Sequence, residues 1–147
     1  FFIGSIVREA IVILNKQLLQ DLQREKFNPK SLRWFKDSTK SSININKEFI
    51  ELDKLEGKYI SSYSIIYSLI LRLRGIYLIK SLINNNKFSN EKFKEWLSDY
   101  LPIKEINDMH KVYRYERDGK KIKSIKIKIK STICLLRLLE KEIEKIE

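Results

Sequence analysis

The spacing of apolar residues along the chain predicts a protein built mostly from helices. Near the start, apolar side chains recur every three or four positions, which is typical of an amphipathic helix over about residues 5–26. Asn28-Pro29 is expected to end it. The segment 30–47 that follows is rich in Ser and Lys and has few apolar residues, so we expect a loop there.

The segment 59–83 carries two adjoining apolar stripes, and a helix with that pattern normally lies at the centre of a domain. The next helix is expected over 89–101. Ser89 is placed to accept a hydrogen bond from the first turn, and Phe88 and Phe93 are spaced to form a hydrophobic staple. These signals together predict a buried central helix followed by a short capped one.

The last part of the chain predicts two more helices, over 103–117 and 132–146. Between them Ile and Lys alternate over 125–130, which favours a strand with one solvated face within a small β segment at 120–130. The predicted fold class is therefore mostly α, a single compact helical domain over 1–147 with one β-hairpin or strand excursion.

Composition adds a preference for polyanionic partners. The 147 residues include 30 basic and 19 acidic side chains, which leave a net charge of +11. The segment 111–130 holds nine basic and two acidic residues, and 9 − 2 = +7 of that total. Such a strip can follow a phosphate backbone while tyrosines offer stacking faces, although a merely solvated lysine-rich surface has the same composition. The candidate residues for binding a nucleic-acid template are Arg114, Tyr115, Arg117, Lys120 and Lys121.

Two cations interrupt the apolar stripes of the central helix. Arg72 and Lys80 lie eight residues apart, or about 12 Å along a helix, so their long side chains could converge on one triphosphate. A buried charge needs a carboxylate, a cavity or an anionic ligand, and an internal ion pair or a side chain reaching to solvent is the alternative. Tyr77 is a further candidate for the nucleotide site, whereas Arg74 is expected in solvent.

Several classes of site are excluded by residue counts. The chain has one cysteine, Cys134, and one histidine, His110, so it cannot form an internal disulfide or a typical structural zinc site. His110 is expected to have a structural role. No phosphate-binding loop or zinc-protease motif is present, and no apolar run is long enough for a membrane helix. No basic segment of a secretion signal is recognisable, so we expect a cytoplasmic protein.

Two stretches of the chain carry a recognisable combination of motifs. The first is 71–80, with an Arg and then a Lys eight residues later in a leucine-rich helix, followed by an aromatic pair at 88–96. The second is the basic aromatic segment 110–121, which ends in Gly119-Lys120-Lys121. Together they cover about half of the chain and resemble the C-terminal domain of the DNA primase large subunit, which has Gly-Lys-Arg where the second stretch ends.

The resemblance implies a role in primer synthesis during DNA replication. That family's domain holds a 4Fe–4S cluster on four cysteines, and a chain with Cys134 alone cannot hold it. A cluster-free domain of this size is similar to the non-catalytic third subunit of archaeal DNA primases. Arg72 and Lys80 would then contact the phosphates of the initiating nucleotide, and Arg114 and Lys120 would approach the template.

The same resemblance implies partners. These are the primase large and small subunits, a nucleoside triphosphate, the single-stranded template and the primer, in a nucleoid-associated complex. Phosphoryl transfer would come from a partner subunit, because no metal-binding carboxylate pair is evident, so the chain itself is not expected to be an enzyme.

Two other functions remain open at this stage. The first is a HEPN-like helical accessory module that pairs with a minimal nucleotidyltransferase. A HEPN ribonuclease needs an Arg shortly before its His, and Lys104 and Glu105 stand in that region before His110. The second is a purely structural scaffold.

Overall fold

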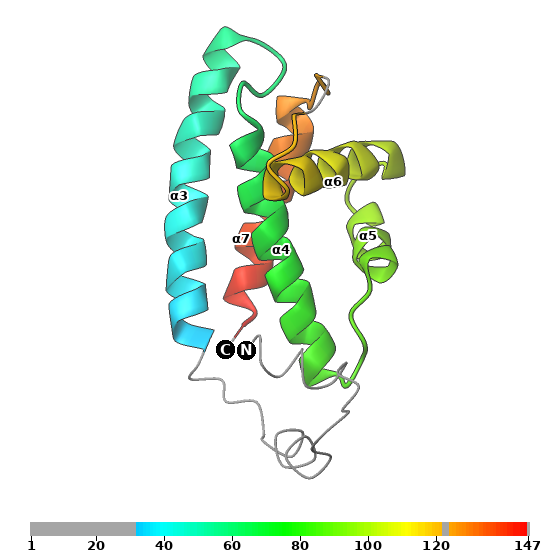
Figure 1. Ribbon diagram of the computed structural model, residues 1–147. Helices are drawn as coiled ribbons and strands as arrows, with labels where there is room; N and C mark the ends of the chain where they lie inside the picture. Colours follow the sequence, from blue (N-terminus) through cyan, green and yellow to red (C-terminus); the bar gives the residue numbers. More distant parts are fainter. Residues whose placement is uncertain (1–31, 122–123, 147) are drawn as a thin grey trace.

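Helices make up most of the chain that the computed structural model describes, residues 32–121 and 124–146. Within these residues their order is α3 (Arg33–Glu56), α4 (Tyr63–Ile83), α5 (Asn90–Ser98), α6 (Ile103–Arg117) and α7 (Ile129–Glu144). The long helices α3, α4 and α7 run beside one another, α6 crosses α4, and α5 packs on α6 (Figure 1). The predicted mostly helical fold is confirmed. The helix predicted over 5–26 lies outside the described residues.

The α4 helix forms the centre of the domain, as its two apolar stripes predict. The side chains with no exposed surface include five of its residues, Ile66, Leu69, Leu73, Ile76 and Ile79. It begins at Tyr63 rather than at 59 because Ser62 is its N-cap, whose side chain accepts a hydrogen bond from the backbone of Ser64. Its neighbours α3, α6 and α7 each cover part of its circumference.

The prediction of a loop over 30–47 is wrong, because α3 is helical from Arg33 onward. Its inward face mixes polar and apolar side chains, so composition alone conceals the helix. The buried residues of this face are Thr39, Ser42, Ile43, Asn46, Ile50 and Asp53. The buried Asn46 donates to the Ser42 carbonyl at 2.8 Å and to the Ser68 hydroxyl of α4 at 3.0 Å. Three other apolar residues at helical spacing face outward and are more than half exposed, Ile45, Phe49 and Leu52.

A glycine allows α3 to approach α4 closely. A Cβ added to Gly75 of α4 would lie 2.9 Å from Cζ of Phe35, which is closer than real Cβ contacts. The Phe35 ring therefore occupies the space that any larger residue at 75 would need. This contact helps to fix the spacing between the two helices.

The described residues of 120–130 contain no strand, and this part of the predicted fold is corrected. Residues 58–60 and 127–129 share one isolated antiparallel bridge, with hydrogen bonds of 3.0 Å from Ile60 N to Ile127 O and from Ile129 N to Lys58 O. The alternating pattern predicted the two faces correctly, because Ile127 and Ile129 are buried and Lys128 is exposed. The pairing stays short because α7 begins at Ile129.

The remaining boundaries follow local signals. Ser89 caps α5 as predicted, and its hydroxyl accepts from the backbone nitrogen of Lys92 at 3.1 Å. The predicted helix 103–117 coincides with α6, and α7 begins three residues before the predicted 132. Among the described helices, none has the length and apolar character needed to cross a membrane.

Candidate nucleic-acid interface

A basic cavity of about 380 Å³ lies against the outer face of α6, and we call it the α6 cavity. Its lining is formed by Lys94, Asn107, His110, Lys111, Arg114, Tyr115, Asp118 and Lys120. Four of these side chains are cationic and one is a carboxylate, so a positive potential dominates the opening. Three of the residues predicted to contact a template, Arg114, Tyr115 and Lys120, are brought together here.

The helical period of α6 explains why these residues share one face. Asn107, Lys111, Arg114 and Asp118 are spaced by four, three and four positions and therefore line up along the helix. The opposite face of α6 is buried against α4 and includes Ile106, Met109 and Tyr113. The core thus holds the helix in the rotation that exposes its basic row.

Arg74 of α4 lies behind this cavity, and the prediction that it is solvated is wrong. It donates a hydrogen bond to Oδ1 of Asn90 at 2.6 Å and lies 3.5 Å from Nε2 of His110. Three rings surround its guanidinium carbon at 5.1, 5.9 and 5.3 Å, those of Phe88, Phe93 and Tyr113. Burial lowers the pKa of Arg74 from its ordinary value, and the Tyr113 hydroxyl opposes that change.

The pKa of His110 reflects the burial and the positive charge at this site. It is 7% exposed, and its pKa is lowered to about 4, first by burial and then by the neighbouring cations. These cations are Lys94, Arg74, Arg114 and Arg117. The imidazole is therefore neutral at pH 7 and can hydrogen-bond to a ligand without adding charge, while the surrounding cations supply the attraction for an anion.

Sequence reasoning missed the part of this cluster that lies outside 111–121. Arg74 and Lys94 come from α4 and α5, and only the packing of those helices on α6 brings them to His110. A signal for His110 was present, because His110, Arg114 and Arg117 are spaced by four and three residues on one helix. That spacing places the histidine on the same helix face as these two arginines.

The other predicted template residues are placed differently. Arg117 is exposed, donates to Oδ1 of Asp118 at 2.8 Å and lies over the Tyr113 ring at 6.0 Å. The Arg117 hydrogen bond is the first cause of the lowered pKa of Asp118. Lys121 is exposed and does not line the α6 cavity. Tyr115 is half-buried at the cavity wall, where its ring can serve as a stacking surface.

The central-helix cation Lys80 has an acidic partner from α7. It forms an ion pair with Glu142, whose side chain is 1% exposed, and its ammonium lies 5.4 Å from the Trp96 ring centroid. Burial raises the pKa of Glu142, but hydrogen bonds from Lys145 and Lys80 outweigh it and the net shift is downward. For Lys80, therefore, the structure shows the internal ion pair that the sequence analysis gave as the alternative to a triphosphate site.

Arg72 and Tyr77 complete the predicted triphosphate site. Arg72 takes part in none of the ion pairs recorded for residues 32–121 and 124–146, its buried Nε lacks a hydrogen-bond partner there, and burial lowers its pKa. The Tyr77 ring is stacked on Trp96, with centroids 5.4 Å apart, and packs edge-on against Phe88 and Phe93. Neither residue lines the α6 cavity, and neither does Lys80.

The described residues contain no group of three or more His, Cys, Asp or Glu side chains placed to hold a metal ion. Comparison with known proteins supplies no further guide, because no family model, no curated protein and no solved structure matches this chain. The functional argument therefore depends on the geometry and charge of the site itself.

Proposed function

We propose that this chain is a non-catalytic subunit that binds single-stranded nucleic acid at the α6 cavity, in a DNA primase complex. The observation that carries the proposal is the convergence of four cations from α5, α6 and the residues after it on one opening, with a single carboxylate among them. A half-buried tyrosine at the wall adds a stacking surface. Cationic grooves combined with rings are the usual means of holding a single strand without reading its sequence.

Each residue has a separate role in this proposal. Lys111, Arg114 and Lys120 neutralise successive phosphates, with Arg114 able to bind one through two parallel hydrogen bonds. Tyr115 supports a base beside them. The neutral His110 donates or accepts one hydrogen bond at the inner wall.

For the initiating nucleotide, the proposal now depends chiefly on Arg72. Arg72 enters none of the ion pairs recorded for the described residues, which leaves its guanidinium charge available to an anion. Lys80 would have to leave Glu142 to reach a triphosphate. The primase large and small subunits supply phosphoryl transfer, and this chain steadies the template and the first nucleotide against each other.

Anisotropy of a labelled oligothymidylate tests the template site. Arg114→Gln with Lys120→Gln is expected to weaken binding and to lower the slope of log K against log salt by about 1.4, or about 0.7 for each lost phosphate contact. The matched control is Lys58→Gln with Lys87→Gln, which removes the same charge from two exposed residues outside the cavity. An equal loss in both double variants would contradict a defined site.

Primer synthesis with the primase large and small subunits tests the complex. Adding this chain is expected to raise initiation more than elongation, and Arg72→Ala is expected to remove that gain while leaving the chain folded. Undiminished initiation by a folded Arg72→Ala protein would refute the nucleotide role. Co-purification of a minimal nucleotidyltransferase in place of primase subunits would favour the HEPN-like alternative.

A further inference from the structure

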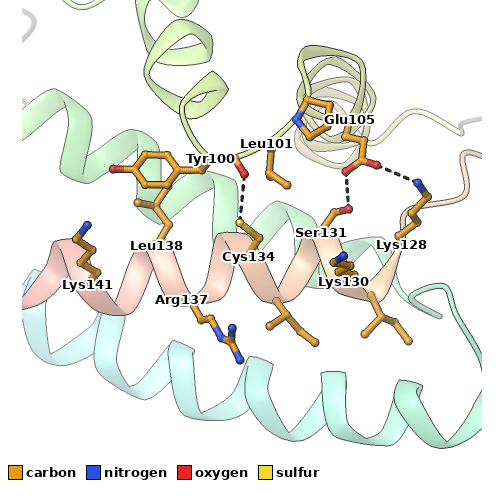
Figure 2. A pocket seen from close by; sticks show the side chains of 13 residues that line it. Tyr100, Leu101, Glu105, Lys128, Lys130, Ser131, Cys134, Arg137, Leu138 and Lys141 are labelled. Carbon is orange, nitrogen blue, oxygen red and sulfur yellow. Dashed lines mark hydrogen bonds and ion pairs between the residues drawn. The ribbon is translucent and has the colours of Figure 1, made fainter.

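A second cavity, of about 860 Å³, runs along the outer face of α7, and we call it the α7 groove. In Figure 2, Tyr100 and Leu101 lie on one side of α7 and Arg137 lies on the other, while Lys128 and Lys141 stand toward the two ends. Its volume is within the range of ligand-binding clefts. None of its lining residues belongs to the α6 cavity, so it is a separate surface.

The groove combines an aliphatic floor with a row of cations. Leu101, Ile133 and Leu138 contribute apolar surface. Lys130, Arg137 and Lys141 are exposed and enter none of the ion pairs recorded for the described part of the chain. They extend over twelve residues of α7, or about 16 Å, which is about three helical turns.

The acidic residue in the lining, Glu105, offsets only part of this charge, because it is paired with Lys128 and its attraction to Lys130 is the smallest of the causes that lower its pKa. Oε1 accepts from Nζ of Lys128 at 3.1 Å, and Oε2 accepts from the Ser131 hydroxyl. Those contacts lower the pKa of Glu105, the Ser131 hydrogen bond first. The first turn of α7 contains no acidic residue, so the positive end of its helix dipole adds to the local potential.

We propose that the α7 groove binds an acidic amphipathic helix of a partner protein. Carboxylates of that helix would face Lys130, Arg137 and Lys141, and its aliphatic side chains would pack on Ile133 and Leu101, which is the helix-in-groove mode of recognition. A single strand of nucleic acid fits less well. Its bases need ring faces for stacking, whereas the floor is aliphatic and the Tyr100 ring packs edge-on against Trp96, with centroids 6.4 Å apart.

The alkylation rate of Cys134 can show whether a ligand occupies the α7 groove. It is the single cysteine of the sequence, it lines the groove and is partly exposed, and its thiol donates to the Tyr100 carbonyl at 3.5 Å. The probe is a capped, fluorescein-labelled peptide of about four helical turns, with Leu at helical spacing on one face and Glu on the other. Saturable binding is expected to slow maleimide alkylation of Cys134 by about tenfold at saturation.

Variants separate the groove from the general positive charge of the chain. Arg137→Glu with Lys141→Glu is expected to weaken peptide binding at least about tenfold, and Ile133→Ala about threefold. Lys58→Glu with Lys87→Glu makes the same charge change outside the groove and is expected to leave binding within about twofold. A peptide with Gln in place of Glu, and an oligothymidylate, serve as ligand controls.

Three results would overturn the proposal. Equal weakening by both charge-reversal pairs would mean that attraction is diffuse. Protection of Cys134 by oligothymidylate but not by the peptide would assign the groove to nucleic acid. Peptide binding without protection of Cys134 would place the peptide elsewhere. Because these assays leave Arg114 and Lys120 unchanged, the proposal and the template-binding function succeed or fail separately.

Discussion

The ion pair between Lys80 and Glu142 allows a sharp test of whether Lys80 is structural or binds nucleotide. Replacing Lys80 by Met keeps a straight side chain near Trp96 and removes the ammonium that faces Glu142. Breaking a buried pair costs about 3–5 kcal/mol in general. Here we expect a smaller loss of about 1–2 kcal/mol, because Lys80 is 35% exposed and Lys145 still donates to Glu142 at 2.6 Å.

Urea unfolding at pH 7 measures this loss. Lys80→Met, Glu142→Gln and the double variant form a cycle, in which the double variant is expected to lose about 1 kcal/mol less than the sum of the single ones. The matched control is Lys47→Met. It breaks the more exposed ion pair with Glu140, and we expect it to change the unfolding free energy by less than about 0.5 kcal/mol.

The unfolding free energy at low pH gives a second measurement, and the direction of its change can be derived from the pKa of Glu142. The pKa of Glu142 is lowered in the folded protein, so its contribution to stability is present above the ordinary glutamate pKa and is lost as the pH falls through the lowered value. The difference in unfolding free energy between the parent protein and Lys80→Met is therefore expected to narrow in acid. The same difference at all pH values would show that Glu142 does not respond to Lys80.

One result would refute a structural role for Lys80. A Lys80→Met protein as stable as the parent, but without any rise in melting temperature on adding a nucleoside triphosphate, would make Lys80 an anion-binding residue. A destabilised Lys80→Met protein whose melting temperature still rises on adding a nucleoside triphosphate would make Lys80 a structural residue.

Three further predictions follow from single contacts. Gly75→Ala is expected to lower the unfolding free energy by about 1–2 kcal/mol despite better helix propensity, since the new Cβ meets Phe35, and Phe35→Leu should restore much of it in urea unfolding. Ser89→Ala should cost about 1 kcal/mol through loss of the α5 cap, measured by thermal unfolding. The pKa of His110 near 4 implies stability that is complete above the unfolded histidine pKa and falls as the pH drops toward 4, by about 2–3 kcal/mol in total. Imidazole NMR of this single histidine checks its pKa, and a normal pKa would contradict the burial of its ring.

Local signals in the sequence were enough for several elements. The two stripes of α4, the Ser89 cap of α5 and the bounds of α6 depend on residues within a few positions of one another, and the structure agrees with each prediction. The alternation over 125–130 likewise predicted which side chains are buried. The basic residues Lys111, Arg114 and Arg117 were visible for the same reason, because they share the helix α6.

Tertiary structure decided the rest, and the reason is distance along the chain. The inward face of α3 includes the buried polar residue Asn46, which hydrogen-bonds to Ser68 of α4, whereas composition alone indicated a loop. Lys80 forms its ion pair with Glu142, which lies 62 residues away in the sequence, and no local pattern reveals this pairing. Arg74 becomes part of the basic cluster only when α6 packs on α4 and brings His110 to it. Periodicity sets which face of a helix turns inward, whereas the partner of a charge on that face is set by the packing of the whole chain.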